Sequence, residues 1–303
     1  MSPVRVLVTG AAGQVGVDLV STLRGEVPPG ADPQWQPDGV KIVPDEFEVL
    51  GVARRDLDIT DRDAVTRALA LTKPDVVVNL AAYTAVDQAE RDVEACYAVN
   101  ADATGLLSQA CATVGAHFVT VSTDYVFDGE KGSSYDEGDQ PNPQSVYGAS
   151  KWAGEQRCRD EDTIVRTSWV MGVRGASVVH VIADRARNGS NVRFVDDQTG
   201  TVTLAADLAR ALVTVVRERP GGVWHVANGG NATWFEVARF VGHEFGRDDE
   251  FATPITTAAL SPAPLARRPR RSDLNTAKWC SRWVAPPDWR DGVSRLLRDR
   301  VAS

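Results

Sequence analysis

The chain has 303 residues, enough for one large α/β domain or for a domain with a smaller lobe, and its 43% hydrophobic and 24% charged residues are ordinary for a globular protein. Its formal net charge of −8 argues against nucleic acid or an anionic membrane surface as a partner. No apolar run is long enough to cross a bilayer, and the chain opens directly on an apolar strand. We therefore expect a protein of the cytoplasm.

The four cysteines, Cys96, Cys111, Cys158 and Cys280, form no C-x-x-C pair and have no histidine nearby at zinc-ligand spacing. We expect free thiols in a reducing compartment and no protein-bound metal. His117, at the start of a predicted strand, also lacks a metal-spaced partner, so we expect a structural role for it.

The first predicted elements are a strand at Val4–Val8 and an apolar-periodic helix that runs through Leu23, joined by a glycine-rich turn. Gly10 would allow the tight turn, Gly13 would let the backbone approach a pyrophosphate, and Gly16 would let the helix pack closely on the sheet. The helix N-terminus would then face the anion. A plain strand–turn–helix corner without a ligand is the alternative interpretation.

Residues 25–44 are rich in Pro, Gly and Asp and predict a loop, and 47–53 predict the second strand. Arg54 and Arg55 follow that strand, where an acidic residue would bind a ribose 2′-hydroxyl and an arginine would accept a 2′-phosphate. The pair favours NADP, although a solvated basic pair is an equal alternative. Asp58 lies further on, where a carboxylate could face the adenine.

Two further strands are predicted at 75–80 and 117–122, and each is followed by a segment that leaves room for a ligand. The first runs into small residues, Ala81 and Ala82, and the second into the hydroxyls of Ser122 and Thr123. Hydroxyls at such an edge either cap the loop or donate to a carbonyl. The intervening segments predict helices at 61–71, 87–98 and 103–114.

A Pro/Asn-rich loop at 136–144 leads to a predicted helix at 147–158 that begins with Tyr147 and Lys151. Residues four apart share one helix face, so the ammonium would lower the pKa of the phenol from its ordinary value of about 10. The phenol would then donate and accept protons near neutral pH. A solvated helix face is the alternative, but all these loops lie at one edge of a parallel sheet, which predicts a single site.

In the second half, Trp and Pro are concentrated, as in a small lobe that closes over a cleft. The fold class is therefore α/β, a Rossmann-type doubly wound parallel sheet with a smaller C-terminal substrate-binding lobe. We assign 1–168 to the dinucleotide-binding domain, with part of the later chain returning to it, and 169–303 mainly to the lobe. The predicted elements are strands at 163–167 and 223–227, helices at 178–187, 205–216, 234–245 and 289–297, a loop at 194–201 and an irregular segment at 254–269.

With these motifs in place, the chain resembles an extended short-chain dehydrogenase/reductase and, more narrowly, the dTDP-4-dehydrorhamnose reductase family. The resemblance covers nearly the whole chain. The Tyr147/Lys151 pair is typical of the superfamily. The segments that indicate the narrower family are 13–16, 58–60, 81–87, 122–129, 142–148 and 166–170.

The resemblance implies NAD(P)H-dependent reduction of the C4 keto group of dTDP-4-dehydro-L-rhamnose to dTDP-L-rhamnose. Tyr147 would protonate the C4 oxygen, Lys151 would hold the nicotinamide ribose, and Thr123 would polarise the carbonyl. Asp124 and Trp169 would face the sugar. The residues expected to contact the cofactor are Gly10, Gly13, Gln14, Val15, Gly16, Arg54, Asp58, Ile59, Ala81, Ala82, Tyr83, Tyr147 and Lys151.

The sequence departs from the family pattern in two segments. Val202 stands where the family usually has proline, and 175–178 replaces a stretch that usually contains Asn-Phe. These departures leave open a reductase of another deoxysugar nucleotide, and a non-catalytic NADP-binding regulatory subunit is a further alternative.

The choice between NADPH and NADH also stays open at this stage. Some members of the family dimerise through acidic residues that bind Mg²⁺, and Asp18 matches one such place, while the others have no evident counterpart. We expect a monomer or homodimer.

Overall fold

The computed structural model describes residues 2–39, 41–43, 45–175 and 177–301. Two predictions include positions outside the described residues. These positions are residues 40 and 44 of the predicted loop at 25–44, and residue 176 of the segment 175–178, which departs from the family pattern.

A six-stranded sheet forms the centre of the molecule, in the order β10-β5-β4-β3-β1-β2. Every neighbouring pair is parallel, which confirms the predicted Rossmann-type sheet. The strands are β1 (Val4–Thr9), β2 (Phe47–Val52), β3 (Val76–Asn79), β4 (His117–Thr123), β5 (Thr163–Thr167) and β10 (Gly222–His225).

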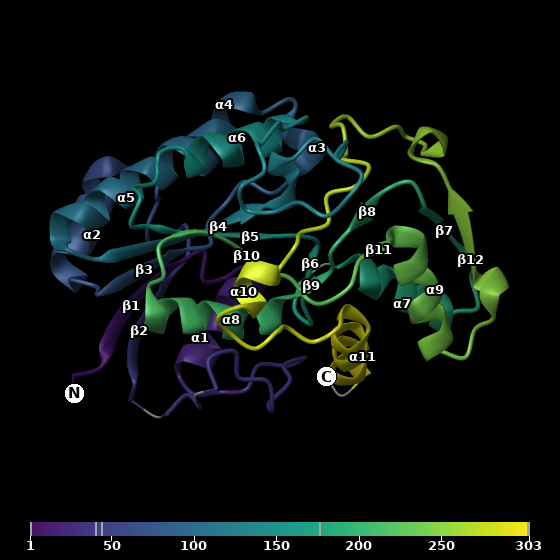
Figure 1. Cartoon of the computed structure of the whole chain (residues 1–303), viewed down its shortest axis with the longest axis horizontal. Coiled ribbons are helices and arrows are strands. Elements are labelled where there is room, and N and C mark those ends of the chain that lie inside the picture. Colours follow the sequence, from purple (N-terminus) through teal and green to yellow (C-terminus); the bar gives the residue numbers. More distant parts are fainter. Residues whose placement is uncertain (1, 40, 44, 176, 302–303) are drawn as a thin grey trace.

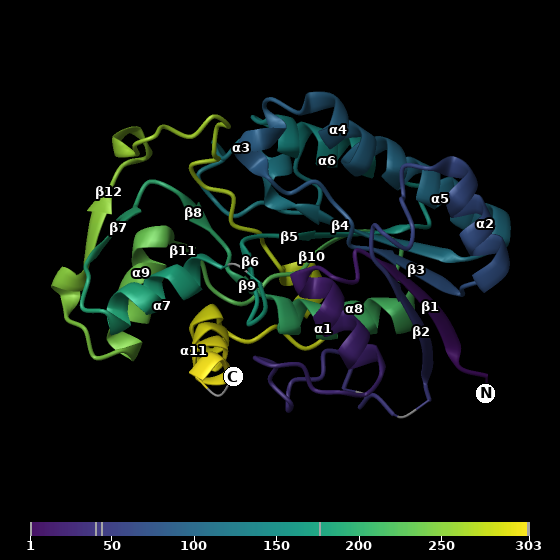
Figure 2. The same ribbon diagram turned by 180° about the vertical axis from the view of Figure 1, so that it is seen from behind.

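Helices cover both faces of this sheet (Figures 1 and 2). One face carries α2 (Arg62–Thr72), α5 (Ala103–Val114) and α6 (Val146–Glu155), and the other carries α1 (Gln14–Leu23) and α8 (Ala205–Glu218). Because side chains alternate along a strand, the valines of β3 serve both layers. Val76 and Val78 pack with Leu212 of α8, whereas Val77 packs with Leu69 and Leu107 on the opposite face.

A smaller lobe lies beside one end of the sheet and has its own apolar core, which includes Phe251 and Trp289. It contains α7 (Val178–Arg187), α9 (Trp234–Glu244), α11 (Trp289–Val301) and the parallel pair β7 (Val192–Val195) and β12 (Ala252–Ile255). Both β10 and α8 belong to the central layers although they follow residue 168. The domain division at residue 168 itself stays a prediction.

Short elements connect the sheet to the lobe. The pair β6 (Val170–Met171) and β9 (Thr203–Leu204) is parallel, and β8 (Thr199–Gly200) and β11 (Ala232–Thr233) are antiparallel.

The predicted loop at 194–201 and the predicted irregular segment at 254–269 were therefore partly wrong. They contain the end of β7, all of β8 and the end of β12. The short helix α10 spans Ala277–Cys280, and 3-10 turns span Asp124–Val126, Asp249–Phe251 and Thr257–Ala259.

The helix predicted at 103–114 is confirmed by α5, whereas the one predicted at 87–98 differs from the structure. The latter is broken into α3 (Val86–Ala89) and α4 (Val93–Tyr97), and a π-helical turn at Ala98–Asp102 joins α4 to α5 without a gap. This turn holds Asn100, whose side-chain oxygen accepts a hydrogen bond from the Tyr83 backbone N–H at 2.8 Å. Its side-chain nitrogen donates to the Ser150 hydroxyl at 3.0 Å. The irregular turn thus ties the loop after β3 to α6.

The structure also bears on the cysteines and on His117. All four cysteines are free thiols, as expected. The His117 Nε2 atom lies 2.8 Å from the Thr163 hydroxyl, a contact between β4 and β5 that confirms its structural role. Within the described ranges, no helix has the length and apolar character needed to span a bilayer.

One buried ion pair fixes α6 against β5, and its removal gives a stability test. Glu155 of α6 accepts from Arg166 of β5 at 2.7 and 3.0 Å, and both side chains are 2% exposed. We expect Arg166→Met to lower the free energy of unfolding by about 3–5 kcal/mol, because Glu155 keeps a buried and unpaired charge. The double variant Arg166→Met/Glu155→Leu should recover most of this loss in urea unfolding. A double variant no more stable than the single one would contradict the assignment.

Candidate active site

One cavity of about 520 Å³ lies at the carboxyl edge of the central sheet. The segments that follow β1, β3, β4 and β5 all contribute to it, as the parallel arrangement requires. Its lining consists of Gly10, Gly13, Gln14, Val15, Gly16, Leu80, Ala81, Ala82, Thr84, Val121, Ser122, Thr123, Tyr147, Lys151, Thr167, Ser168, Trp169 and Val170.

The glycine-rich turn forms one wall, and two of its glycines are sterically required. Gly10 has φ +67°, and a Cβ there would lie 2.6 Å from the Ala81 backbone nitrogen. A Cβ on Gly16 would lie 2.3 Å from the Gly10 carbonyl oxygen, so only glycine lets α1 approach the turn. Gly13 is the N-cap of α1 and provides no side-chain acceptor for the first N–H groups. The start of α1 can therefore receive an anion.

Hydrogen bonds of polar side chains fix the segment after β3 beside the glycine-rich turn. The Thr9 hydroxyl donates to the Asn79 side-chain oxygen at 2.6 Å, and that oxygen also accepts from the Ala81 N–H at 3.3 Å. Thr9 and Asn79 are adjacent in the β1–β3 ladder. This bond fixes the start of the Ala81–Ala82 segment beside the glycine turn.

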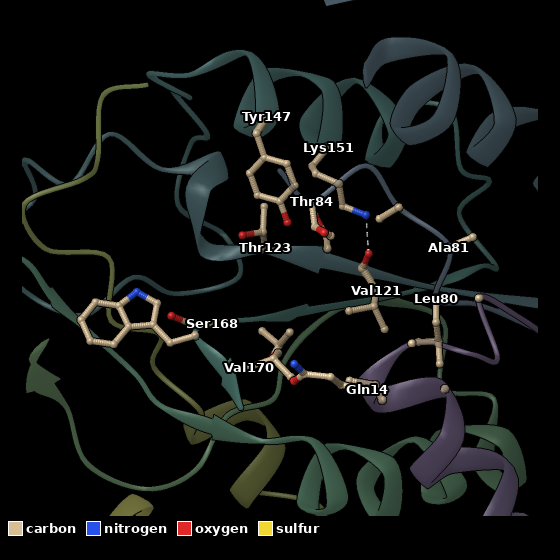
Figure 3. Close-up of a pocket in the computed structure, with 18 residues that line it drawn as sticks. Gln14, Leu80, Ala81, Thr84, Val121, Thr123, Tyr147, Lys151, Ser168 and Val170 are labelled. Carbon is tan, nitrogen blue, oxygen red and sulfur yellow. Dashed lines mark hydrogen bonds between the residues drawn. The ribbon is translucent and has the colours of Figure 1, made fainter. Parts of the chain in front are cut away.

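Tyr147 and Lys151 enter the cavity from α6, on the side opposite Gln14 (Figure 3). The helix starts at Ser145, whose hydroxyl accepts from the Gly148 N–H at 3.2 Å. Lys151 Nζ donates to the Val121 carbonyl oxygen of β4 at 2.6 Å, the dashed line in Figure 3. The predicted helical pair therefore faces the cavity and is not a solvated surface.

The pKa of Tyr147 shifts in the direction opposite to the prediction. Burial raises the pKa of Tyr147 to about 12, opposed by a hydrogen bond with Thr123. Burial also lowers the pKa of Lys151 to about 8, opposed by the charge of Glu155. The expectation that Lys151 lowers the pKa of the phenol was wrong for this structure, because desolvation of the phenolate dominates. At neutral pH the phenol is protonated and the ammonium is charged.

Thr123 is the last residue of β4 and lies under the Tyr147 phenol (Figure 3), and Asp124 begins the turn that follows. The Thr123 hydroxyl accepts from the Tyr125 N–H at 3.2 Å and donates to Asp124 Oδ1 at 3.1 Å. It thus caps the following turn, which confirms the first interpretation, and it also lines the cavity, while donation to a carbonyl stays a prediction. Asp124 accepts from the Ser272 hydroxyl at 2.5 Å, and burial raises its pKa to about 6.

Trp169 closes the cavity on the side of the small lobe. It has φ +42°, a left-handed conformation that costs a non-glycine residue about 1–3 kcal/mol. Its ring stacks on Trp234, with centroids 4.1 Å apart and an interplanar angle of 11°. A Cβ on Gly200 would lie 2.5 Å from the Trp169 ring, so the indole is enclosed from both sides.

Four predicted cofactor residues are not part of this lining among the described residues. The Tyr83 hydroxyl donates to Asp92 at 2.7 Å, and Thr84 reaches the cavity instead. Ile59 is buried in the core beside α2 and α5. Arg54 and Asp58 lie beyond β2 and form an exposed contact of 3.9 Å. Their roles stay predictions.

A second cavity, of about 700 Å³, lies between the sheet edge and the small lobe. Sequence reasoning missed it, because its wall combines segments distant in the sequence. Arg91, Arg193 and Arg268 supply three guanidinium groups, of which Arg268 pairs with Asp87 at 2.8 Å. The remaining lining residues are Tyr125, Val178, Phe194, Val195, Gln198, Trp234, Leu260, Pro262, Ala263, Pro264 and Leu265.

Comparison with known proteins agrees with this geometry. Residues 39–301 match the family model described as the RmlD substrate binding domain. A dTDP-4-dehydrorhamnose reductase of Mycobacterium tuberculosis is 38% identical, over 97% of this chain and 92% of that protein. The chain belongs to the dTDP-4-dehydrorhamnose reductase family.

Two other relatives bear on cofactor and substrate. The crystal structure of the Bacillus anthracis dTDP-4-dehydrorhamnose reductase in complex with NADP has a TM-score of 0.85 and 30% identity, covering 98% of this chain and 99% of that one. A probable dTDP-4,6-dihydroxy-2-methyloxan-3-one 4-ketoreductase of Streptomyces antibioticus is 36% identical, over 99% of this chain and 96% of that protein.

Asp18, the residue considered for Mg²⁺ in this family, is buried on α1. Burial raises its pKa to about 6, and Arg174 Nη1 lies 4.0 Å from its carboxylate. Within the described ranges, no group of three or more His, Cys, Asp or Glu side chains could hold a metal ion.

The two glycines of the turn give a matched pair of variants. Gly16→Ala should lower the free energy of unfolding by about 1–3 kcal/mol, because the new methyl group meets backbone that cannot rotate away. Gly13→Ala should cost about 1 kcal/mol or less, since the nearest atom to its Cβ is 3.3 Å away. Urea unfolding of both variants checks this order. Equal losses would contradict the packing role assigned to Gly16.

Proposed function

We propose that this chain uses NADPH to reduce the C4 keto group of a nucleotide-linked 6-deoxy-4-keto sugar. The substrate we infer is dTDP-4-dehydro-L-rhamnose, and the product is dTDP-L-rhamnose. The observation that carries the proposal is the convergence of Tyr147, Lys151 and Thr123 on the cavity walled by the glycine turn. The names of the family members support the same reaction.

The cavity fits a dinucleotide. Gly10 and Gly16 leave the turn without side chains, and the N-terminus of α1 opens beside Gly13, where a pyrophosphate would be held. Gln14, Val15, Ala81 and Ala82 line the same wall. The side chains of Arg54 and Arg55 are 89% and 88% exposed just after β2, a location suited to a 2′-phosphate, which favours NADPH over NADH.

Three side chains of the protein would carry out the proton chemistry. The neutral Tyr147 phenol donates its proton to the C4 oxygen, and the Thr123 hydroxyl turns from Asp124 Oδ1 to donate a hydrogen bond to that oxygen. The Lys151 ammonium stabilises the phenolate that remains on Tyr147. When bound, the reduced nicotinamide supplies the hydride to C4. The raised pKa of Tyr147 suits this direction, since a reductase needs the protonated phenol.

We infer that the nucleotide sugar occupies parts of both cavities, because Trp169 and Tyr147 line the first and pack against Trp234 and Tyr125 of the second. The keto sugar would lie between Tyr147 and Trp169, with Asp124 below, and the nucleoside diphosphate would enter the second cavity. Arg193 lines that cavity and suits the diphosphate charge. Residues 169–303 would thus supply most of the substrate-binding lobe, and residues 1–168 the cofactor domain.

A second candidate is reduction of another deoxysugar nucleotide. Val202, which replaces the usual proline, is fully buried in the lobe core two residues after Gly200, which packs on the Trp169 ring. The Streptomyces antibioticus relative is named for a different 4-keto sugar. Parallel assays with dTDP-4-dehydro-L-rhamnose and dTDP-4-keto-6-deoxy-D-glucose decide between them. A preference of tenfold or more for the second substrate would replace the rhamnose assignment.

We also infer a cytoplasmic protein, because its cysteines are free thiols and its proposed reductant is an intracellular cofactor. We infer that no Mg²⁺ is needed, since Arg174 faces the Asp18 carboxylate. Light scattering with and without Mg²⁺ distinguishes a monomer from a homodimer and tests the metal.

Removal of the phenolic hydroxyl tests the proposed acid. Tyr147→Phe should lower kcat by about 10²–10⁴-fold, because the proton donor is lost, while the dissociation constant for NADPH stays unchanged. NADPH oxidation followed at 340 nm, and a fluorescence titration of NADPH, measure the two quantities. Tyr97→Phe, outside both cavities, is the matched control. If Tyr147→Phe kept the turnover of the wild type, this role would be excluded. If the wild-type protein bound NADPH tightly but turned over no 4-keto sugar, a regulatory subunit would be favoured.

The lowered pKa of Lys151 gives a pH test. Because that pKa is about 8, the side chain is charged below pH 8 and neutral above it. We expect kcat/KM for reduction to fall as the pH rises through about 8, since a neutral lysine no longer stabilises the phenolate. Lys151→Arg, which keeps its charge, should be less active but lack this fall. A wild-type profile that is flat to pH 10 would contradict the assignment.

A further inference from the structure

Two pairs of aromatic rings separate the two cavities. Tyr147 lines the cofactor cavity and Tyr125 lines the second cavity, and their rings meet edge to face at 5.8 Å. Trp169 lines the cofactor cavity and Trp234 lines the second, and their rings stack at 4.1 Å. A substrate that occupies both cavities must pass along this partition.

The two rings that face the cofactor cavity, those of Tyr147 and Trp169, are held in place by different means. Tyr147 is fixed by α6, whereas Trp169 follows β5 in an isolated left-handed conformation at φ +42°. A non-glycine residue keeps such a backbone only where its surroundings define it. Gly200 encloses one side of the Trp169 ring, and the Trp234 ring stacks on it.

Trp234 is itself held firmly as the first residue of α9. Thr233 and Glu236 form a reciprocal capping box at this helix start. The Thr233 hydroxyl also donates to Asp196 at 2.9 Å, and its backbone pairs with Thr199 in the β8–β11 ladder. The same ladder pairs Ala232 with Gly200. The β8–β11 pair therefore positions both Gly200 and Trp234, the two residues that contact the Trp169 ring.

We propose that Trp234 is a positioning residue: its ring fixes the Trp169 indole, which in turn holds the keto sugar against Tyr147. The inference rests on the proposed function for the role of Trp169, and it adds a residue to which neither the sequence pattern nor the comparisons assign a part. Trp234 lines the second cavity and not the one that holds Tyr147, so it acts on the reacting C4 carbonyl through Trp169, although it also borders the space proposed for the nucleoside diphosphate.

A positioning role predicts a specific pattern of kinetic effects. Trp234→Ala should lower kcat by about 10–100-fold, because a sugar displaced by about 1 Å reacts far more slowly. Trp234→Phe keeps a flat ring against Trp169 and should stay much closer to wild type. Both variants should bind NADPH as the wild type does, since the glycine turn is untouched. Phe235→Leu, the next residue of α9, is the control and should keep the wild-type kcat.

A readout without turnover keeps the inference independent of the substrate assignment. In protein labelled with 5-fluorotryptophan, the Trp169 resonance is assigned by its loss in Trp169→Phe. We expect Trp234→Ala to shift this resonance and Trp234→Phe to leave it close to its original position. dTDP added as a probe of the second cavity should shift the Trp234 resonance.

The possible outcomes distinguish the positioning role of Trp234 from the proposed function. A Trp169 resonance unmoved by Trp234→Ala, or a folded Trp234→Ala protein with wild-type kcat, would overturn the positioning role. Equal loss of kcat in Trp234→Ala and Trp234→Phe would also overturn it, since the stacked ring would not be what matters. Absence of wild-type turnover, with the expected fluorine shifts, would overturn the proposed function but support the coupling of the two rings.

Discussion

The parallel pairing of the central strands is the constraint on which the site depends. Because β1, β3, β4 and β5 run in the same direction, their carboxyl ends meet at one edge, and the segments after them must share one cavity. Burial on both faces makes β1 and β3 largely apolar, and the polar side chains that line the cavity lie at or beyond the strand ends. Gly10 and Thr123 reach the same space for this reason, although 113 positions separate them in the sequence.

Burial also sets the protonation states that the proposed reaction requires. Desolvation alone would keep Tyr147 neutral and would favour a neutral Lys151. The Glu155 carboxylate, one turn beyond Lys151 on α6, offsets part of that effect on the lysine, and Arg166 holds Glu155 in place. The result at neutral pH is a protonated acid beside a cation, the arrangement needed to protonate a carbonyl and stabilise the remaining phenolate.

The sequence predicted what local pattern determines. The glycine turn, the strand ends and the Tyr147/Lys151 pair have signals within a few residues, and the structure brings most of them to one cavity. Contacts between distant segments had no such signal. Ser272 bonds to Asp124 across 148 positions, and Trp234 at the start of α9 stacks on Trp169 in the bend after β5. The direction of the Tyr147 pKa shift was missed because spacing on a helix does not reveal burial.

The most direct test of the account follows the hydrogen itself. NADPH carrying deuterium at the transferred position of the nicotinamide C4 is incubated with the protein and dTDP-4-dehydro-L-rhamnose, and the sugar product is examined by proton NMR. The account predicts deuterium at C4 of the dTDP-L-rhamnose formed, in a one-to-one ratio with the cofactor oxidised. Oxidised cofactor without deuterium at that carbon would contradict the claim that this sheet edge is a hydride-transfer site for the C4 ketone.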